Sequence, residues 1–268
     1  MCRILEISRS GYYKYRDKDF SKKKDVHTDL VVKVFHESHQ IYGARKIKKA
    51  CEDQDVILSR RRIGRIMAEE GLVSRYTVAQ FKPRRQKVNR DDVKNIIDQD
   101  FEGRSKNEVI VSDLTYVRVG NRWNYICVLV DLFNREIVGY SVGPRKTSQL
   151  VKEAFATVKG SLSNIQYFYS DRGMEFKSSL IEDLINTFDI SRSLSEAGVP
   201  YDNAVAEATF KTIKTEFVYP NKFKILQQLR QELAVYVWWF NNKRYHQTLN
   251  YLTPVQYRLE NVIKKSVH

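Results

Sequence analysis

The order of hydrophobic and polar positions predicts short helices in the first third of the chain. Apolar residues recur at helical spacing over residues 29–37 and 45–51, and a turn at Gly43 separates these two segments. A third helix is predicted after Ser59, which favours a helix N-cap, and Gly71 is placed to end it. This order favours a helix-turn-helix module, although a small helical bundle with a basic surface would show the same pattern.

Beyond residue 100 the pattern changes to strands and amphipathic helices. Three apolar runs with short turns between them predict an antiparallel meander, and two later strands are each preceded by a helix. The expected fold is therefore α/β, with a mixed five-stranded sheet and helices on both faces. The strands are expected at 108–119, 123–132, 135–142, 165–169 and 190–194, and the helices at 147–159, 178–188, 203–217, 225–241 and 254–264.

Basic charge is concentrated at the N-terminal end. The 268 residues carry 46 Lys and Arg against 32 Asp and Glu, and residues 1–90 account for +12 of the net charge of +14. An excess confined to one segment favours a polyanionic partner, which here means nucleic acid. The side chains expected to contact DNA are Arg60, Arg61, Arg62 and Arg65 of the third helix, and Lys82, Arg84 and Arg85 of the following segment, which is predicted to be a linker.

Other features of the composition exclude several classes of protein. The hydrophobic content of 42% is high enough for a sizeable core, which excludes wholesale disorder. No apolar run approaches the ~20 residues of a membrane span, and the first residues lack the apolar stretch of a signal peptide. The three cysteines are widely spaced, so they fit a reducing cytoplasm and no disulfide framework.

Three carboxylates stand at positions where acidic side chains have chemical consequences. Asp113 lies inside an apolar strand, where a carboxylate is costly unless it is paired or bound to a cation. Asp171 follows the fourth strand, at the end where open sheets bind ligands, and Glu207 lies in a helix among small residues. Taken singly, Asp171 also fits a turn and Glu207 a solvated helix face. If the first and fourth strands are neighbours, the three carboxylates converge, and such a cluster favours Mg²⁺ or Mn²⁺.

The spacing of these carboxylates resembles that of the D,D-35-E transposases of the insertion-sequence-three family. Thirty-five residues separate Asp171 from Glu207, and the resemblance covers nearly the whole chain. It is to the second-reading-frame product, which shares the retroviral-integrase core. The matching blocks are DLTYV at 113–117, SDRGMEF at 170–176, PYDNAVAEATFKTIKTE at 200–216, WFNNKRYHQTL at 239–249 and YGARKI at 42–47.

The resemblance implies an RNase H-like core that binds two Mg²⁺ (or Mn²⁺) ions through Asp113, Asp171 and Glu207. It implies a DDE polynucleotidyl transferase, in which water first exposes a 3′-OH that then attacks a phosphodiester. Lys214 and Lys211 are expected to position the DNA end, together with Asn203, because Lys214 returns to within ~20° of the helix face of Glu207. One departure is Glu196-Ala197-Gly198, where family members often carry Arg-Lys before the glycine.

The resemblance also implies partners, a location and a domain order. The partners are the element ends and target DNA, further copies of the chain on DNA, and the product of an upstream reading frame, because Met1 stands inside what resembles the end of a longer region. The location is the bacterial cytoplasm, in association with the nucleoid. The domain order is an N-terminal tail at 1–24, a helix-turn-helix-like DNA-binding domain at 25–73, a basic linker at 74–100, and an integrase-type catalytic core with C-terminal helices at 101–268.

Two alternatives remain open at this stage. A helix-turn-helix regulator fits the basic N-terminal third but does not need the three carboxylates. An RNase H-like nuclease without strand transfer shares the metal chemistry, and activity on a DNA 3′ end separates these alternatives.

Overall fold

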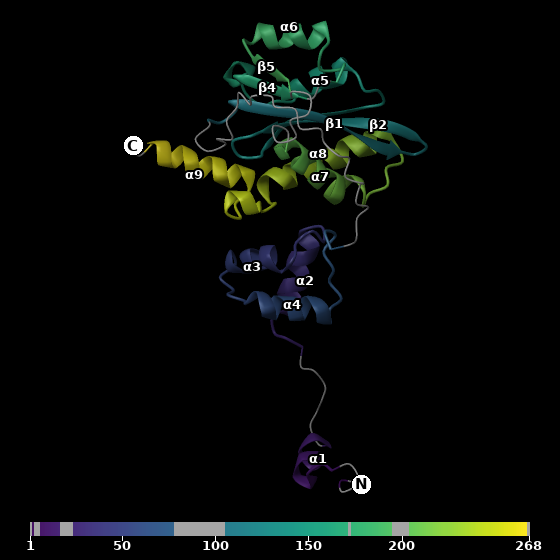
Figure 1. Cartoon of the computed structure of the whole chain (residues 1–268), viewed down its shortest axis with the longest axis vertical. Helices are drawn as coiled ribbons and strands as arrows, with labels where there is room; N and C mark the ends of the chain where they lie inside the picture. Colours follow the sequence, from purple (N-terminus) through teal and green to yellow (C-terminus); the bar gives the residue numbers. More distant parts are fainter. Residues whose placement is uncertain are drawn as a thin grey trace, which may run out of the picture.

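The computed structural model describes residues 2, 6–16, 24–77, 105–170, 173–194 and 204–266, with the backbone alone at 193–194, 204–207 and 262–266. Figure 1 shows the N-terminal helices on one side of a layered core whose sheet lies between two sets of helices. Helix α1 (Arg9–Arg16) lies in the segment predicted as a tail, and it buries none of its residues. No helix in the described part of the chain is both long and apolar enough to cross a membrane.

The three helices predicted for the N-terminal third are present. They are α2 (Thr28–Glu37), α3 (Ala44–Glu52) and α4 (Arg60–Glu69), which pack against one another. The Ser59 hydroxyl caps α4 by accepting a hydrogen bond from the Arg62 amide at 3.2 Å. Gly71 adopts φ 65° directly after the C-cap, a conformation that glycine takes without strain. The two predicted ends of α4 are therefore confirmed.

The predicted five-stranded mixed sheet is confirmed, and its strand order is β3-β2-β1-β4-β5. Strands β1 (Val109–Val119), β2 (Arg122–Asp131) and β3 (Ile137–Gly143) form the antiparallel meander. Strands β4 (Tyr167–Ser170) and β5 (Ser191–Leu194) continue the sheet in parallel from β1. The first and fourth strands are therefore neighbours, which is the condition on which the predicted convergence of the three carboxylates depends.

Helices cover both faces of the sheet (Figure 1). Helices α5 (Ser148–Phe155) and α6 (Ser179–Thr187) pack on the face that carries Ile110 and Leu129. Helices α7 (Ala204–Ile213) and α8 (Leu226–Asn242) pack on the opposite face, against Val111 and Val117. The chain ends in α9 (Pro254–Ser266), and the short helical turns η1 (Leu162–Asn164) and η3 (Gln247–Leu249) join other elements.

Two predicted helices differ from the observed ones at their C-terminal ends. Helix α5 stops at Phe155 and not near residue 159, because the Thr157 side chain turns to hydrogen-bond the backbone of Tyr140 on strand β3. The helix predicted over 203–217 is α7 followed by a π-helical turn, η2 (Lys214–Val218). Three consecutive residues of η2 are buried, namely Thr215, Glu216 and Phe217.

The helix-turn-helix-like domain packs on the C-terminal end of α8. The Tyr42 hydroxyl donates to the Lys243 carbonyl at 3.0 Å and accepts from the Tyr245 amide at 2.9 Å. The Tyr42 and Tyr245 rings are stacked, with centroids 5.6 Å apart. On the same side, the Ser74 hydroxyl donates to the Ile41 carbonyl, so the start of the predicted linker is part of this packed region.

Candidate active site

Asp113 lies on the face of β1 that α7 covers. Side chains alternate along a strand, so Asp113 shares its face with the buried Val111 and Val117. The carboxylate is half-buried, and its Oδ1 accepts a hydrogen bond from the Leu114 amide at 2.7 Å. A carboxylate held in this position on an apolar strand can bind a cation at the edge of the core.

The other two elements that carry the predicted carboxylates meet β1 near Asp113. Ser112 is paired with Ser170, the last residue of β4, and Asp171 follows Ser170 in the chain. Helix α7 contacts β1 and buries Phe210 against the core on that face. Glu207 lies in the first part of α7, one turn before Phe210. Asp171 and the side chain of Glu207 lie outside the described part of the structure, so the three elements are placed but only the Asp113 carboxylate is described.

A further acidic side chain, Glu175, acts on the same buried thiol as Asp113. Burial is the main cause that raises the pKa of the Cys127 thiol to about 12; the charges of Asp113 and Glu175 also raise it, and the Ser112 hydrogen bond lowers it. Both carboxylates therefore lie within electrostatic range of Cys127 on β2. Glu175 is itself buried and ion-paired with Lys146, whose Nζ lies 2.7 Å from Oε1. The sequence analysis did not single out Glu175, although it stands four residues after Asp171.

No metal-ligand cluster is complete within the described side chains. Among them, no three His, Cys, Asp or Glu residues lie close enough to share one ion. Asp113 is the predicted ligand whose side chain is described, and its donors are oxygen atoms of the kind that Mg²⁺ prefers.

The two lysines predicted to hold the DNA end differ in their surroundings. Lys214 is half-buried at the first position of η2, and its ammonium lies 5.8 Å from the centroid of the Tyr116 ring. Tyr116 stands three residues after Asp113 on β1 and is 61% exposed. Lys211 is exposed on α7. The Tyr116 ring therefore holds Lys214 beside the strand that carries Asp113.

The predicted DNA contacts of the N-terminal domain divide into two kinds. Arg62 donates to both carboxylate oxygens of Asp25, at 2.8 Å each, and Arg65 reaches the same carboxylate at 3.3 Å. Arg60 and Arg61 are exposed. Arg62 therefore has a structural contact within the domain as well as its predicted contact with DNA. The predicted contacts that lie outside the described residues are Lys82, Arg84, Arg85 and Asn203.

A buried ion pair joins η2 to the chain that follows α8. Arg244 donates to Glu216 of η2 from Nε at 2.8 Å and from Nη2 at 2.7 Å. The hydroxyls of Tyr76 and Tyr236 donate to the same carboxylate. Burial favours a higher pKa for Glu216, but the Arg244 guanidinium and these hydrogen bonds hold the pKa below its usual value. The sequence analysis missed this pair because its members are far apart in the chain.

Comparison with known proteins accounts for most of the chain. Models of the integrase core domain match residues 103–200 and 207–262, and a model of an HTH-like domain matches residues 22–80. The chain is 27% identical over 263 residues to the putative transposase InsK for insertion sequence element IS150 of Escherichia coli (strain K12), covering 96% of this chain and 92% of that protein. It is 28% identical over 271 residues to the transposase InsF for insertion sequence IS3A of the same strain, covering 98% and 94%.

Among solved structures, the HTLV-2 integrase catalytic core domain in complex with magnesium is similar with a TM-score of 0.40 and 18% identity. The match covers 57% of this chain and 97% of that one.

The matched domains and their order define an integrase-core protein with an N-terminal helix-turn-helix-like domain. Within that class, the chain is similar over nearly its whole length to transposases of insertion sequences such as IS150 and IS3A, in agreement with the insertion-sequence-three resemblance of its motifs.

Proposed function

We propose that this transposase cleaves and joins DNA strands at a site formed by Asp113, Asp171 and Glu207. The observation that carries the proposal is the meeting of three elements at one place: β1 pairs with β4 where Asp171 follows, and α7 packs on β1. The reaction is polynucleotidyl transfer, with water as the first nucleophile and the exposed 3′-OH as the second. Transposase relatives along nearly the full chain favour strand transfer over simple nuclease or regulatory activity.

The donor set fits divalent cations. Three carboxylates supply only oxygen ligands, and the half-buried position of Asp113 leaves part of its side chain exposed. Asp113, Asp171 and Glu207 would hold two Mg²⁺ (or Mn²⁺) ions, which when bound stabilise negative charge on the attacking and leaving oxygens.

The basic side chains of this chain bind and orient the DNA in the proposal. Lys214, held by the Tyr116 ring, contacts a phosphate of the reacting end, and exposed Lys211 lies one turn nearer Glu207. Arg60 and Arg61 contact DNA from α4 within a DNA-binding domain at 25–73, followed by a linker at 74–100 and a core at 101–268. The proposed partners are DNA, further copies of the chain assembled on it and the product of an upstream reading frame, in the bacterial nucleoid.

Removal of divalent cations will abolish the reaction and spare the fold. We expect EDTA-treated protein to neither cleave nor join a labelled duplex of the element's own terminal sequence, and Mg²⁺ or Mn²⁺ to restore both steps. Ca²⁺ is expected to support DNA binding without chemistry, because its coordination is larger and looser. The measurement is gel analysis of products beside anisotropy of the bound DNA. Cleavage in EDTA would contradict a metal-dependent site.

Loss of the Lys214 charge will slow the reaction without removing the carboxylate site. Lys214→Ala is expected to lower single-turnover end cleavage by about tenfold, since one phosphate contact is lost. Lys214→Arg should restore part of the rate, because the charge remains while the geometry changes. Lys222→Ala, which removes an exposed lysine beyond η2, is the matched control. Wild-type cleavage by Lys214→Ala would show that this lysine is only a surface charge.

A further inference from the structure

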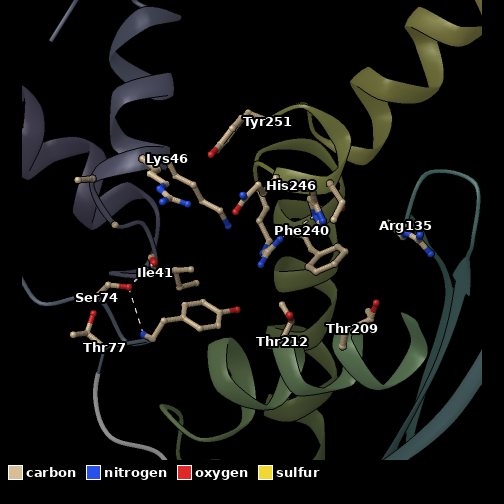
Figure 2. A pocket seen from close by; sticks show the side chains of 18 residues that line it. Ile41, Lys46, Ser74, Thr77, Arg135, Thr209, Thr212, Phe240, His246 and Tyr251 are labelled. Atoms are coloured by element: carbon tan, nitrogen blue, oxygen red, sulfur yellow. Dashed lines mark hydrogen bonds between the residues drawn. The ribbon is translucent and has the colours of Figure 1, made fainter. Parts of the chain in front are cut away.

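A cavity of about 710 Å³ lies between the helix-turn-helix-like domain and the catalytic core. Its walls come from the start of α3, residues 74–77, helix α7, the chain after α8 and the turn between β2 and β3. Figure 2 shows Lys46 and Arg135 on opposite sides of it, with Thr209 and Thr212 of α7 between them. The volume lies within the ~300–1,000 Å³ of ordinary ligand sites.

Lys46 differs from the other lysines of its helix. Lys48 and Lys49 of α3 form ion pairs one turn ahead, with Glu52 at 2.7 Å and Asp53 at 2.5 Å. Lys46 makes no ion pair with any described residue, and its ammonium lies 5.3 Å from the centroid of the Tyr42 ring. Burial, together with the positive charge of Arg244, lowers the pKa of Lys46 to about 7, although the charge of Glu216 acts in the opposite direction. A desolvated ammonium that forms no ion pair is unfavourable until an anion binds beside it.

Arg135 is the second cationic side chain of interest in this cavity. It occupies the β2–β3 turn with φ 63°, and its Nη1 is buried without a hydrogen-bond partner among the described residues. Burial lowers the pKa of this guanidinium, although the nearby charge of Asp131 acts in the opposite direction. Buried guanidinium N–H groups are nearly always satisfied in proteins, so an unsatisfied one points to an external acceptor.

The other lining groups favour an anion and not a cation. The described residues that line the cavity include no Asp or Glu, and its Arg244 is paired with Glu216 outside the lining. Burial holds the pKa of the His246 ring well below its usual value. The hydroxyls of Thr209 and Thr212 are donors that a phosphate oxygen can use. Thr209 stands two residues after Glu207 in the chain, so the cavity lies along the same helix that carries this proposed ligand.

We propose that this cavity binds backbone phosphates of the DNA strand that leads away from the catalytic centre, with Lys46 and Arg135 as its two cationic contacts. The inference rests on the proposed function, because the position of the cavity along α7 is what connects it to the reacting strand. Cations on opposite walls with hydroxyls between them suit consecutive phosphates of one strand better than a single small anion. Neither side chain was among the DNA contacts expected from the sequence.

The test compares Lys46→Met and Arg135→Gln with Lys48→Met, which removes an ion-paired lysine from the same helix. The probe is a labelled duplex of random sequence, titrated by fluorescence anisotropy at increasing KCl without divalent cations. Each cavity variant is expected to reduce the slope of log K against log salt by ~0.9, and to weaken binding about tenfold at moderate salt. Lys48→Met should keep the wild-type slope.

Three further measurements separate a binding role from a structural one. Lys46→Met should have a melting temperature at or above that of the wild type, since it removes a desolvated charge, while Lys46→Arg should keep the DNA slope. A slope unchanged in both Lys46→Met and Arg135→Gln would overturn the proposal. If both variants bind DNA like the wild type but are no longer stabilised by inorganic phosphate, the cavity binds a free anion. This result would also overturn the proposal. If Arg135→Gln does not fold, the Lys46→Met and Lys46→Arg variants alone test the proposal.

These measurements do not depend on chemistry at the carboxylates. DNA cleavage that persists in an Asp113 variant would contradict the proposed active site. The salt dependence of DNA binding by the Lys46 and Arg135 variants would still test the cavity independently.

Discussion

Asp113→Asn is expected to abolish both DNA cleavage and strand joining while preserving the fold and DNA binding. The amide keeps the size of the side chain but loses the charge that holds a divalent cation. We expect a loss of at least about a thousandfold, which corresponds to ~4 kcal/mol of transition-state stabilisation. Asp171→Asn and Glu207→Gln should have the same effect, because the three carboxylates act as one site.

The stability of the metal-free Asp113 variant gives an independent readout. Carboxylates that converge without a cation repel one another, so Asp113→Asn should melt at or above the wild-type temperature in EDTA. The added stability that Mg²⁺ is expected to give the wild type should be smaller in the variant. Asp183→Asn, which changes an exposed acid on α6, is the control and should leave activity and melting unchanged. Activity of Asp113→Asn within tenfold of the wild type would remove this residue from the catalytic site.

The largest loss of stability is expected from the buried Arg244–Glu216 pair. The side chain of Glu216 is fully buried and that of Arg244 is 8% exposed, and two guanidinium nitrogens bind the carboxylate. Arg244→Met leaves the carboxylate buried without its counter-charge, so we expect a loss of about 3–5 kcal/mol in the free energy of unfolding. The half-buried pair of Lys48 and Glu52 is the control, and Lys48→Met should change stability by less than ~1 kcal/mol.

The pH dependence of unfolding distinguishes this pair from ordinary packing. The pKa of Glu216 is below its usual 4.5 in the folded protein, so its contribution is present above pH 4.5 and is lost as the pH falls toward the folded value. In Arg244→Met, burial without the guanidinium raises the same pKa, so the deficit of the variant should be largest near neutral pH and smaller in acid. Urea unfolding followed by circular dichroism at several pH values measures both curves. A deficit independent of pH would indicate that Arg244 acts through packing alone.

The same residues show how much of the structure could be predicted from the local sequence. The strands and helices were predictable because burial on one face imposes a period of about two or 3.6 residues on the chain itself. The caps of α4 were predictable for the same local reason, since Ser59 and Gly71 act on their own helix end. The π-helical turn was not predicted, and within it Glu216 is buried against Arg244, a partner 28 positions away that the local pattern does not reveal.

The candidate site was also predictable from the sequence only in part. Acidic residues at Asp113, Asp171 and Glu207, and their spacing, indicated a family and a chemistry before any fold was known. The neighbour relation of β1 and β4, on which the site depends, is a property of strand order and came from the tertiary structure.

The roles of individual basic residues depend on their partners. By sequence alone, Lys46 and Lys48 are equivalent positions on one short basic helix, and Arg60 and Arg62 are equivalent on another. In the fold, Lys48 reaches Glu52 and Arg62 reaches Asp25, whereas Lys46 faces a cavity formed with the catalytic core. Local patterning determined the elements, the charge and the kind of chemistry of this transposase. Tertiary structure decided which charges are paired, because Coulomb energy and desolvation depend on distance and burial and not on order in the chain.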